Sequence, residues 1–319
     1  MSFERQDGRT LSELREIHIF FEGLDGVDGS ARFGFGTLLH SRNHPNVYLQ
    51  ADAGDTKALA SVSGPMEVKL SSEQPSKATF EVFVRPLSGL PGMFIFHVYS
   101  EEILLMPLFS YKGTESKALA ESLQCALLPS MILTNNPRSL IQLVAQSLSP
   151  TSYAGSYESS RPPSLRLNPP LIASLINASS LALLNASSFP MCGIICAIGL
   201  GRLRESHTLI VDPSEHELHA LDGGGVFAFL ASRSTSNTAL SLQLVWSSWN
   251  ASPFDQDELV RATAFARGGA EMVWEHMKDS IRSANIHTQM PAAKYPKVKA
   301  EKVDTIPQVP LDDVKMEIV

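Results

Sequence analysis

The chain has 319 residues, of which 44% are hydrophobic and 18% are charged, and its formal net charge is −7 at pH 7. This composition is that of an ordinary globular protein with enough apolar residues for a sizeable core. An acidic chain is not expected to act as a freestanding nucleic-acid binder, so any such contact must be local. Residues 1–15 are polar and charged and lack the apolar run of a secretory signal, so we do not expect secretion.

The cysteines are few and carry no metal-binding or disulfide pattern. Cys125, Cys192 and Cys196 lie in apolar stretches without a CxxC spacing, which is typical of buried thiols in a reducing compartment. The three histidines in residues 207–219 also match no zinc-ligand spacing. The sequence therefore predicts neither a metal site nor a cofactor.

The first third of the chain is predicted to be rich in strands. An apolar run at 17–21 predicts a strand, and the two Asp-Gly pairs in 25–29 predict a turn that leads into a hairpin. Residues 57–69 and 77–86 have the apolar and β-branched character of strands, with Gly and Pro breaks between them. At 116–131 the apolar residues recur at helical spacing, which predicts a helix.

The second half of the chain alternates helices and strands. A strand is predicted at 140–147, then a helix at 171–187 whose small Ala and Ser residues suit close packing on a sheet, then a strand at 191–200. Polar residues interrupt this apolar stretch before it reaches the roughly 20 residues that a membrane span requires. The triplet at 223–225 predicts a tight turn. The remaining elements are strands at 207–212, 224–232 and 239–247 and a helix at 255–283.

Six blocks of sequence within residues 16–283 together carry a resemblance to a known family. Their order along the chain is a more specific signal than any single block. They are Leu24–Phe33, Val62–Lys69, Lys77–Pro86, Asn136–Leu143, Ile176–Ala186 and Ile210–Glu217. In this order they resemble the RNase PH-like ring subunits of the eukaryotic RNA exosome. The resemblance implies an RNase PH-type fold of the α/β (α+β) class, with mixed β-sheets flanked by helices.

The resemblance implies one domain, residues 10–283, and the composition after it predicts a disordered tail at 284–319.

Three segments depart from the family pattern. The segment at 150–170 is rich in Ser, Pro, Tyr and Arg and has ordinary loop chemistry. The segments at 37–53 and 93–112 separate motif halves that the family joins directly, and we interpret them as translated unspliced intron, with functional loops as the alternative. Their presence in abundant mature message would refute the intron hypothesis.

Active relatives cleave RNA from its 3′ end with inorganic phosphate, which requires cationic groups to hold phosphate and carboxylates to bind a metal or move a proton. Their Gly-Gly-Thr-Arg-like phosphate loop falls here on 150–156, which has neither a Gly pair nor an Arg. Glu121 and Gln124 stand where active relatives carry arginines. Asp212 fits the first acidic position, although a simple turn is the favoured alternative, and the second carboxylate would fall at 217–218.

The resemblance thus implies a non-catalytic structural subunit of the exosome core ring that supports 3′-to-5′ RNA processing and degradation, including rRNA maturation. The alternative is a phosphate-dependent 3′-to-5′ exoribonuclease. Lys57, Lys69 and Arg138 are candidate RNA contacts, with a salt bridge as the alternative for Arg138. The implied partners are other RNase PH-like ring subunits, cap proteins, hydrolytic nucleases and RNA in the central channel, with no membrane. The implied locations are nucleus, nucleolus and cytoplasm.

Overall fold

The computed structural model describes residues 5–36 (apart from 6 and 22), 56–85, 112–149, 168–233 and 240–287 (apart from 252 and 254). The segment predicted as an insertion at 37–53 lies outside these residues. So do all but the last residue of the one at 93–112 and most of the one at 150–170. The hypothesis of unspliced intron therefore stays a prediction.

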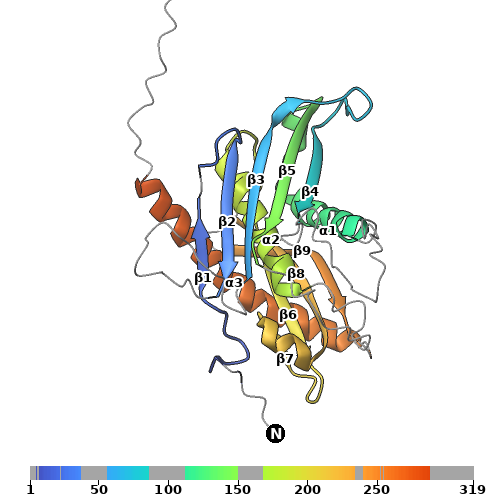
Figure 1. Ribbon diagram of the computed structural model, residues 1–319, viewed down its shortest axis with the longest axis vertical. Helices are drawn as coiled ribbons and strands as arrows, with labels where there is room; N and C mark the ends of the chain where they lie inside the picture. The colour runs from blue at the N-terminus through green and yellow to red at the C-terminus, as the bar shows by residue number, and fades with distance from the viewer. Residues whose placement is uncertain are drawn as a thin grey trace, which may run out of the picture.

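Among the described residues, the first sheet has five strands in the order β1-β2-β3-β5-β4, and its pairs are antiparallel except for the parallel pair β4 and β5 (Figure 1). Along β3 buried and partly buried side chains alternate, as expected for a sheet with one face on the core. The strands are β1 Ile17–Phe20, β2 Gly29–Phe35, β3 Thr56–Glu67, β4 Thr79–Arg85 and β5 Ser139–Ser147.

In the part of the chain that the structure describes, the second sheet has four antiparallel strands in the order β7-β6-β8-β9. Residues 223–225 lie inside β8, so the tight turn predicted there is wrong. A Cβ atom on Gly225 would lie 2.0 Å from the Ser248 carbonyl oxygen, so glycine permits the close approach of the neighbouring strand. The strands are β6 Ile194–Leu203, β7 Leu209–Val211, β8 Leu221–Arg233 and β9 Leu240–Asn250.

Within the described ranges, three α-helices pack on these sheets: α1 Lys112–Leu127, α2 Pro169–Ala186 and α3 Gln256–His287. Helix α2 lies between the two sheets and contacts β2 and β3 on one side and β6 on the other, while α3 covers the other face of the second sheet and α1 packs on β4 (Figure 1). The buried apolar side chains form one main cluster that spans both sheets. The RNase PH-type plan of mixed sheets flanked by helices is thus present.

Two helix ends differ from the predicted boundaries. Helix α2 begins at Pro169, inside the segment predicted as an insertion at 150–170, because a proline is readily accommodated in the first turn of a helix. Helix α3 continues to His287, four residues beyond the predicted end at 283, with the helical pattern extending into the region predicted as tail.

Buried polar groups on α2 complete the hydrogen bonding of β6. Strand β7 pairs only with residues 200–202 of β6, so the preceding edge of β6 has no strand partner among the described residues. The Asn177 side chain donates to the Ala197 carbonyl at 2.9 Å and accepts from its N–H at 2.7 Å. The Ser180 hydroxyl accepts from the Ile195 N–H at 2.8 Å. Within the described part of the chain, α2 alone is long and apolar enough to cross a membrane, but here it is a buried core helix.

Replacing Asn177 with alanine is expected to lower the free energy of unfolding by about 2 kcal/mol, because both backbone groups of Ala197 would stay buried without a partner. Urea denaturation followed by circular dichroism measures the loss. The control is Asn185→Ala, since Asn185 donates one bond, to the Ser30 carbonyl at 3.0 Å, from a partly buried position. Equal losses in the two variants would contradict this role for Asn177.

The prediction that all three cysteines are buried is wrong for two of them, because Cys125 and Cys192 are exposed and only Cys196 is buried. Burial raises the pKa of the Cys196 thiol, which suppresses the reactive thiolate. We therefore expect a thiol-specific colorimetric reagent to modify Cys125 and Cys192 in the native protein and Cys196 only after denaturation. Modification of Cys196 at the rate of the other two would show that the core opens around it.

Candidate functional site

The candidate site lies where the N-terminal segment, the start of β3, the end of β5 and the turn after β7 meet. Asp212 occupies this turn in a left-handed backbone conformation with φ of 46° and is 0% exposed. The Arg15 guanidinium donates to both carboxylate oxygens, at 2.8 Å from Nε and 2.6 Å from Nη2, and the Arg15 backbone N–H donates at 3.1 Å. One residue therefore supplies three donors to the carboxylate of Asp212.

A second buried ion pair lies beside the first. The Arg5 guanidinium donates to the two carboxylate oxygens of Glu217 at 2.8 and 3.1 Å and to the Val211 carbonyl at 2.8 Å. Glu217 also accepts from the Ser214 N–H at 2.7 Å, which forms a capping box at the start of the 3-10 turn 215–220. The carboxylate of Glu217 thus fixes both a helical turn and the N-terminal segment.

Arg9 lies between the two pairs, with its guanidinium nitrogens 3.9 Å from carboxylate oxygens of Asp212 and Glu217. Its Nε also donates to Asp7 at 2.5 Å. Although burial raises the pKa of the Asp7 carboxyl, the hydrogen bond and charge of Arg9 together hold it below its ordinary value. The positive and negative charges in this cluster therefore neutralise one another.

We call the set Arg5, Arg9, Arg15, Asp212 and Glu217 the arginine–carboxylate clamp. It joins the N-terminal segment to the second sheet. Arg15 and Asp212, which bind one another in the clamp, are 197 residues apart in the sequence. A general acid or base, or a metal ligand, must face its substrate or ion, whereas both carboxylates of the clamp are buried and bonded to guanidinium groups. In this structure both carboxylates therefore serve as acceptors for arginine side chains.

Lys57, a predicted RNA contact, lies next to the clamp at the start of β3. The hydroxyl of the adjacent Thr56 accepts from Arg15 at 3.2 Å. The Lys57 N–H donates to the Ser149 hydroxyl at 2.6 Å, and its carbonyl accepts from the Leu148 N–H at 2.8 Å. These bonds fix the end of β5 directly before the expected phosphate loop, 150–156, which lies outside the described residues.

The structure places Lys69 and Arg138, the other two predicted RNA contacts, at the far end of the first sheet. Lys69 follows β3, roughly 40 Å along the strand direction from Lys57 at about 3.3 Å per residue. The Arg138 N–H donates to the Gln74 carbonyl at 3.2 Å, and its Nε lies 3.4 Å from Glu73. The three candidates therefore do not form one surface, and Arg138 makes a salt bridge.

The arginines of the clamp were not identified from the sequence. The sequence does contain three arginines, at positions 5, 9 and 15, before the first strand. It could not show that their partners Glu217 and Asp212 lie close to them in space, because these carboxylates are about 200 residues later in the sequence. Within the described ranges, no group of three or more His, Cys, Asp or Glu side chains is placed to hold a metal ion. His207, one of the three clustered histidines, lies 3.5 Å from Asp222 instead.

Residues 13–188 match the RNase PH family model described as "3′ exoribonuclease family, domain 1". The chain belongs to this family. It is 27% identical to the exosome complex component RRP46 of Saccharomyces cerevisiae over 195 residues, which are 61% of this chain and 65% of that relative, just under two thirds. It is 26% identical to the exosome complex component Rrp41 of Archaeoglobus fulgidus over 279 residues, 87% of this chain and 86% of the relative.

Solved structures have the same fold. The crystal structure of rice Rrp46 superposes with a TM-score of 0.60 at 22% identity and covers 87% of this chain and 100% of the rice chain. The Archaeoglobus fulgidus exosome with RNA bound to the active site gives a TM-score of 0.55 at 14% identity, covering 86% of this chain and 92% of the other. The predicted RNase PH-type fold is therefore confirmed.

Proposed function

We propose that this chain is a non-catalytic structural subunit of the RNA exosome core ring, of the type called exosome component five. In this role it supports 3′-to-5′ RNA processing and degradation, including rRNA maturation. Relatives named as exosome components support the assembly role. The observation that carries the non-catalytic role is the Arg15–Asp212 pair, since the carboxylate expected at a catalytic position is 0% exposed and held by an arginine at 2.6 Å.

The α1 positions where active relatives carry arginines support the same proposal. Glu121 is exposed, and a carboxylate there repels phosphate rather than holding it. The Gln124 side chain donates to the Phe80 carbonyl of β4 at 2.7 Å, so it joins helix to sheet. Neither residue supplies a cation for the attacking phosphate.

The proposed partners are other RNase PH-like ring subunits, cap proteins and hydrolytic nucleases, with RNA passing through the central channel. Lys57, Lys69 and Arg138 stay candidates for contacts with that RNA. The proposed locations are nucleus, nucleolus and cytoplasm. Affinity purification of the tagged chain, with mass spectrometry of what co-purifies and imaging of the tag, tests these proposals. Recovery of the chain without any RNase PH-like subunit would contradict them.

The alternative is a phosphate-dependent 3′-to-5′ exoribonuclease, which is favoured by the likeness to a structure named for RNA bound to its active site. Incubation with end-labelled RNA and inorganic phosphate separates the two functions. We expect no nucleoside diphosphate above the level of a phosphate-free control. Because a neighbour could complete the site, the assay includes both the purified chain and the co-purified ring. Nucleoside diphosphate release that is lost in an Asp212→Asn ring, while the subunit composition and unfolding temperature of that ring stay unchanged, would establish the enzyme.

A further inference from the structure

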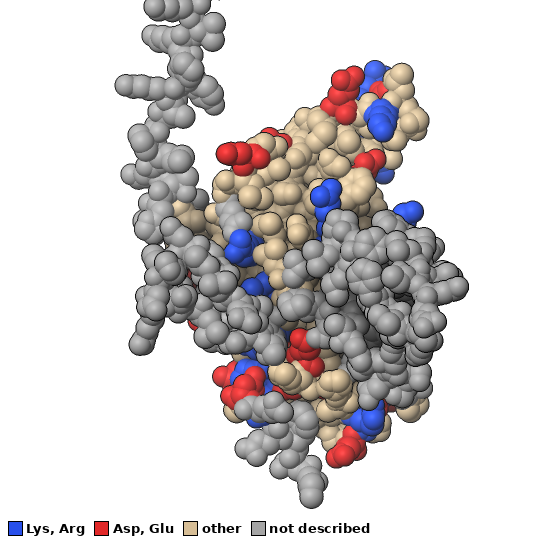
Figure 2. Space-filling view, in the orientation of Figure 1, with Lys and Arg blue, Asp and Glu red and all other residues tan. Residues whose placement is uncertain are grey.

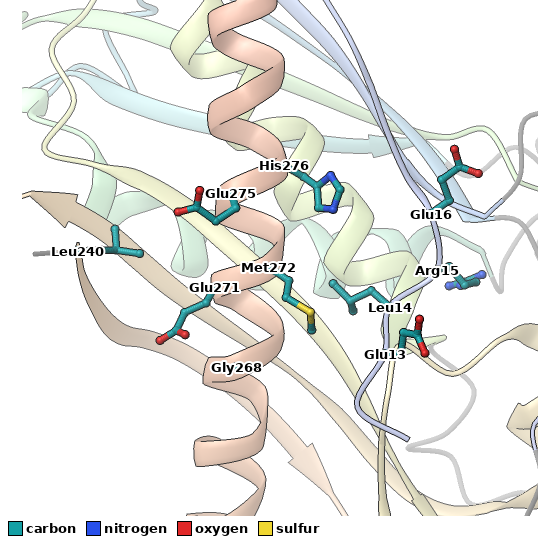
Figure 3. Close-up of a pocket in the computed structure, with 10 residues that line it drawn as sticks. All are labelled: Glu13, Leu14, Arg15, Glu16, Leu240, Gly268, Glu271, Met272, Glu275 and His276. Carbon is teal, nitrogen blue, oxygen red and sulfur yellow. The ribbon is translucent and has the colours of Figure 1, made fainter. Parts of the chain in front are cut away.

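A groove of about 700 Å³ lies between the middle of α3, residues 13–16 and the start of β9. We call its apolar lining side chains, which include Leu14, Leu240 and Met272, its floor. Leu240 is 37% exposed and Met272 is 38% exposed, so these large side chains are not covered by the described part of the chain. Figure 3 shows the Leu14 and Met272 side chains approaching one another between the helix and the N-terminal segment.

We call its charged lining side chains its rim, and most of them are acidic. Glu13 and Glu16 line it from the N-terminal segment, and Glu271 and Glu275 line it from α3 (Figure 3). Arg15 also lines the groove, but its guanidinium donates to Asp212. Glu275 also forms an ion pair with Lys278, one turn further along α3. The groove therefore combines an apolar floor with an excess of carboxylates, which suits a basic segment that carries some apolar side chains.

We propose that this groove binds residues 294–302 of the same chain. This segment lies outside the described residues, and its sequence complements the groove in charge and in apolar character. It contains one acid, Glu301, and Tyr295 and Val298 can occupy the apolar floor. Its cations are Lys294, Lys297, Lys299 and Lys302.

The chain length allows this contact. Helix α3 ends at His287, eleven residues after His276 of the groove, a distance of roughly 17 Å at 1.5 Å per residue. Residues 288–297 can extend over roughly 33 Å, so the lysine-rich segment reaches the rim by folding back along α3. Exposed ion pairs are individually weak, but a tethered segment has an effective concentration in the millimolar range.

Figure 2 shows mixed charge elsewhere on the described surface, with blue and red groups interspersed in the view of Figure 1. The binding proposed here depends on charge, so it weakens as ionic strength rises and exposed pairs are screened. The proposal concerns the isolated chain and does not rest on the proposed function.

Limited trypsin digestion of the full chain at low salt tests the proposal. We expect cleavage after the lysines of 294–302 to be about fivefold slower in the native chain than in a Glu271→Gln/Glu275→Gln variant, because cleavage follows the population of the open form. The matched control is Glu67→Gln/Glu205→Gln, which removes two exposed carboxylates outside the groove and should leave the cleavage rate unchanged. Equal cleavage rates in the native chain and the groove variant would overturn the proposal.

Carbodiimide cross-linking, read by mass spectrometry at two protein concentrations, identifies the occupant directly. Cross-links between the lysines of 294–302 and the rim glutamates, in a yield independent of concentration, support the proposal. Cross-links only between two copies of the chain, cross-links only to carboxylates outside the groove, or no cross-links to this segment would each overturn it.

Discussion

Replacement of Arg15 by methionine is expected to lower the free energy of unfolding by about 3–5 kcal/mol, because it leaves the Asp212 carboxylate buried without its partner. The Arg15 side chain also donates to the Thr56 hydroxyl, so the first sheet would lose a contact with the clamp. Urea denaturation monitored by circular dichroism gives the free energy. Arg138→Met is the control, since the Arg138 side chain is 70% exposed and its loss should cost within about 1 kcal/mol.

A double-mutant cycle shows whether the effect comes from the ion pair. Asp212→Asn removes the charge and retains a residue type that tolerates the left-handed conformation. The double variant Arg15→Met/Asp212→Asn should be more stable than the sum of the single losses predicts, by about 1–3 kcal/mol, because no buried charge stays unpaired. Strict additivity would show that the two residues do not act together, and the structural role given to Asp212 would fail.

Replacement of Arg202 by methionine is expected to cost about 3–5 kcal/mol as well, because Arg202 is 1% exposed and neutralises two carboxylates. Its guanidinium donates to both oxygens of Asp222 at 2.8 and 3.1 Å, to Glu258 at 2.9 Å and to the Pro253 carbonyl at 3.0 Å. Burial lowers the pKa of Arg202, but Asp222 and Glu258 outweigh it and raise the pKa. This residue joins β6, β8 and the first turn of α3.

Arg282→Met is the matched control for this prediction. Arg282 lies on α3 at 3.6 Å from Asp279, and the two side chains are 67% and 71% exposed, so the change should alter stability by less than about 0.5 kcal/mol. Thermal and urea unfolding of both variants supply the comparison. A small loss for Arg202→Met would mean that water reaches Asp222 and Glu258 when the guanidinium is removed.

Local pattern in the sequence predicted most of the elements. The strand expected at 140–147 is β5, Ser139–Ser147, and the helix expected at 171–187 is α2, Pro169–Ala186. These segments have a clear period or a run of apolar residues, and such signals are properties of neighbouring residues. The fold was predicted differently, from the resemblance of six ordered blocks to the RNase PH-like subunits, and these blocks overlap only β2, β3, β4, β5, α2 and β7 among the strands and α-helices.

The sequence by itself determined the order and type of the elements and the fold family. Tertiary structure decided which polar and small residues are buried and which side chains or strands they contact. The sequence favoured a simple turn at Asp212, and only the structure shows that Arg15 binds the carboxylate of this turn residue. The sequence also predicted a turn at residues 223–225, whereas the structure shows a neighbouring strand packed closely against them. Periodicity shows which side of an element is apolar, but pairing across some 200 residues depends on how the elements pack, and that is not encoded in any local pattern.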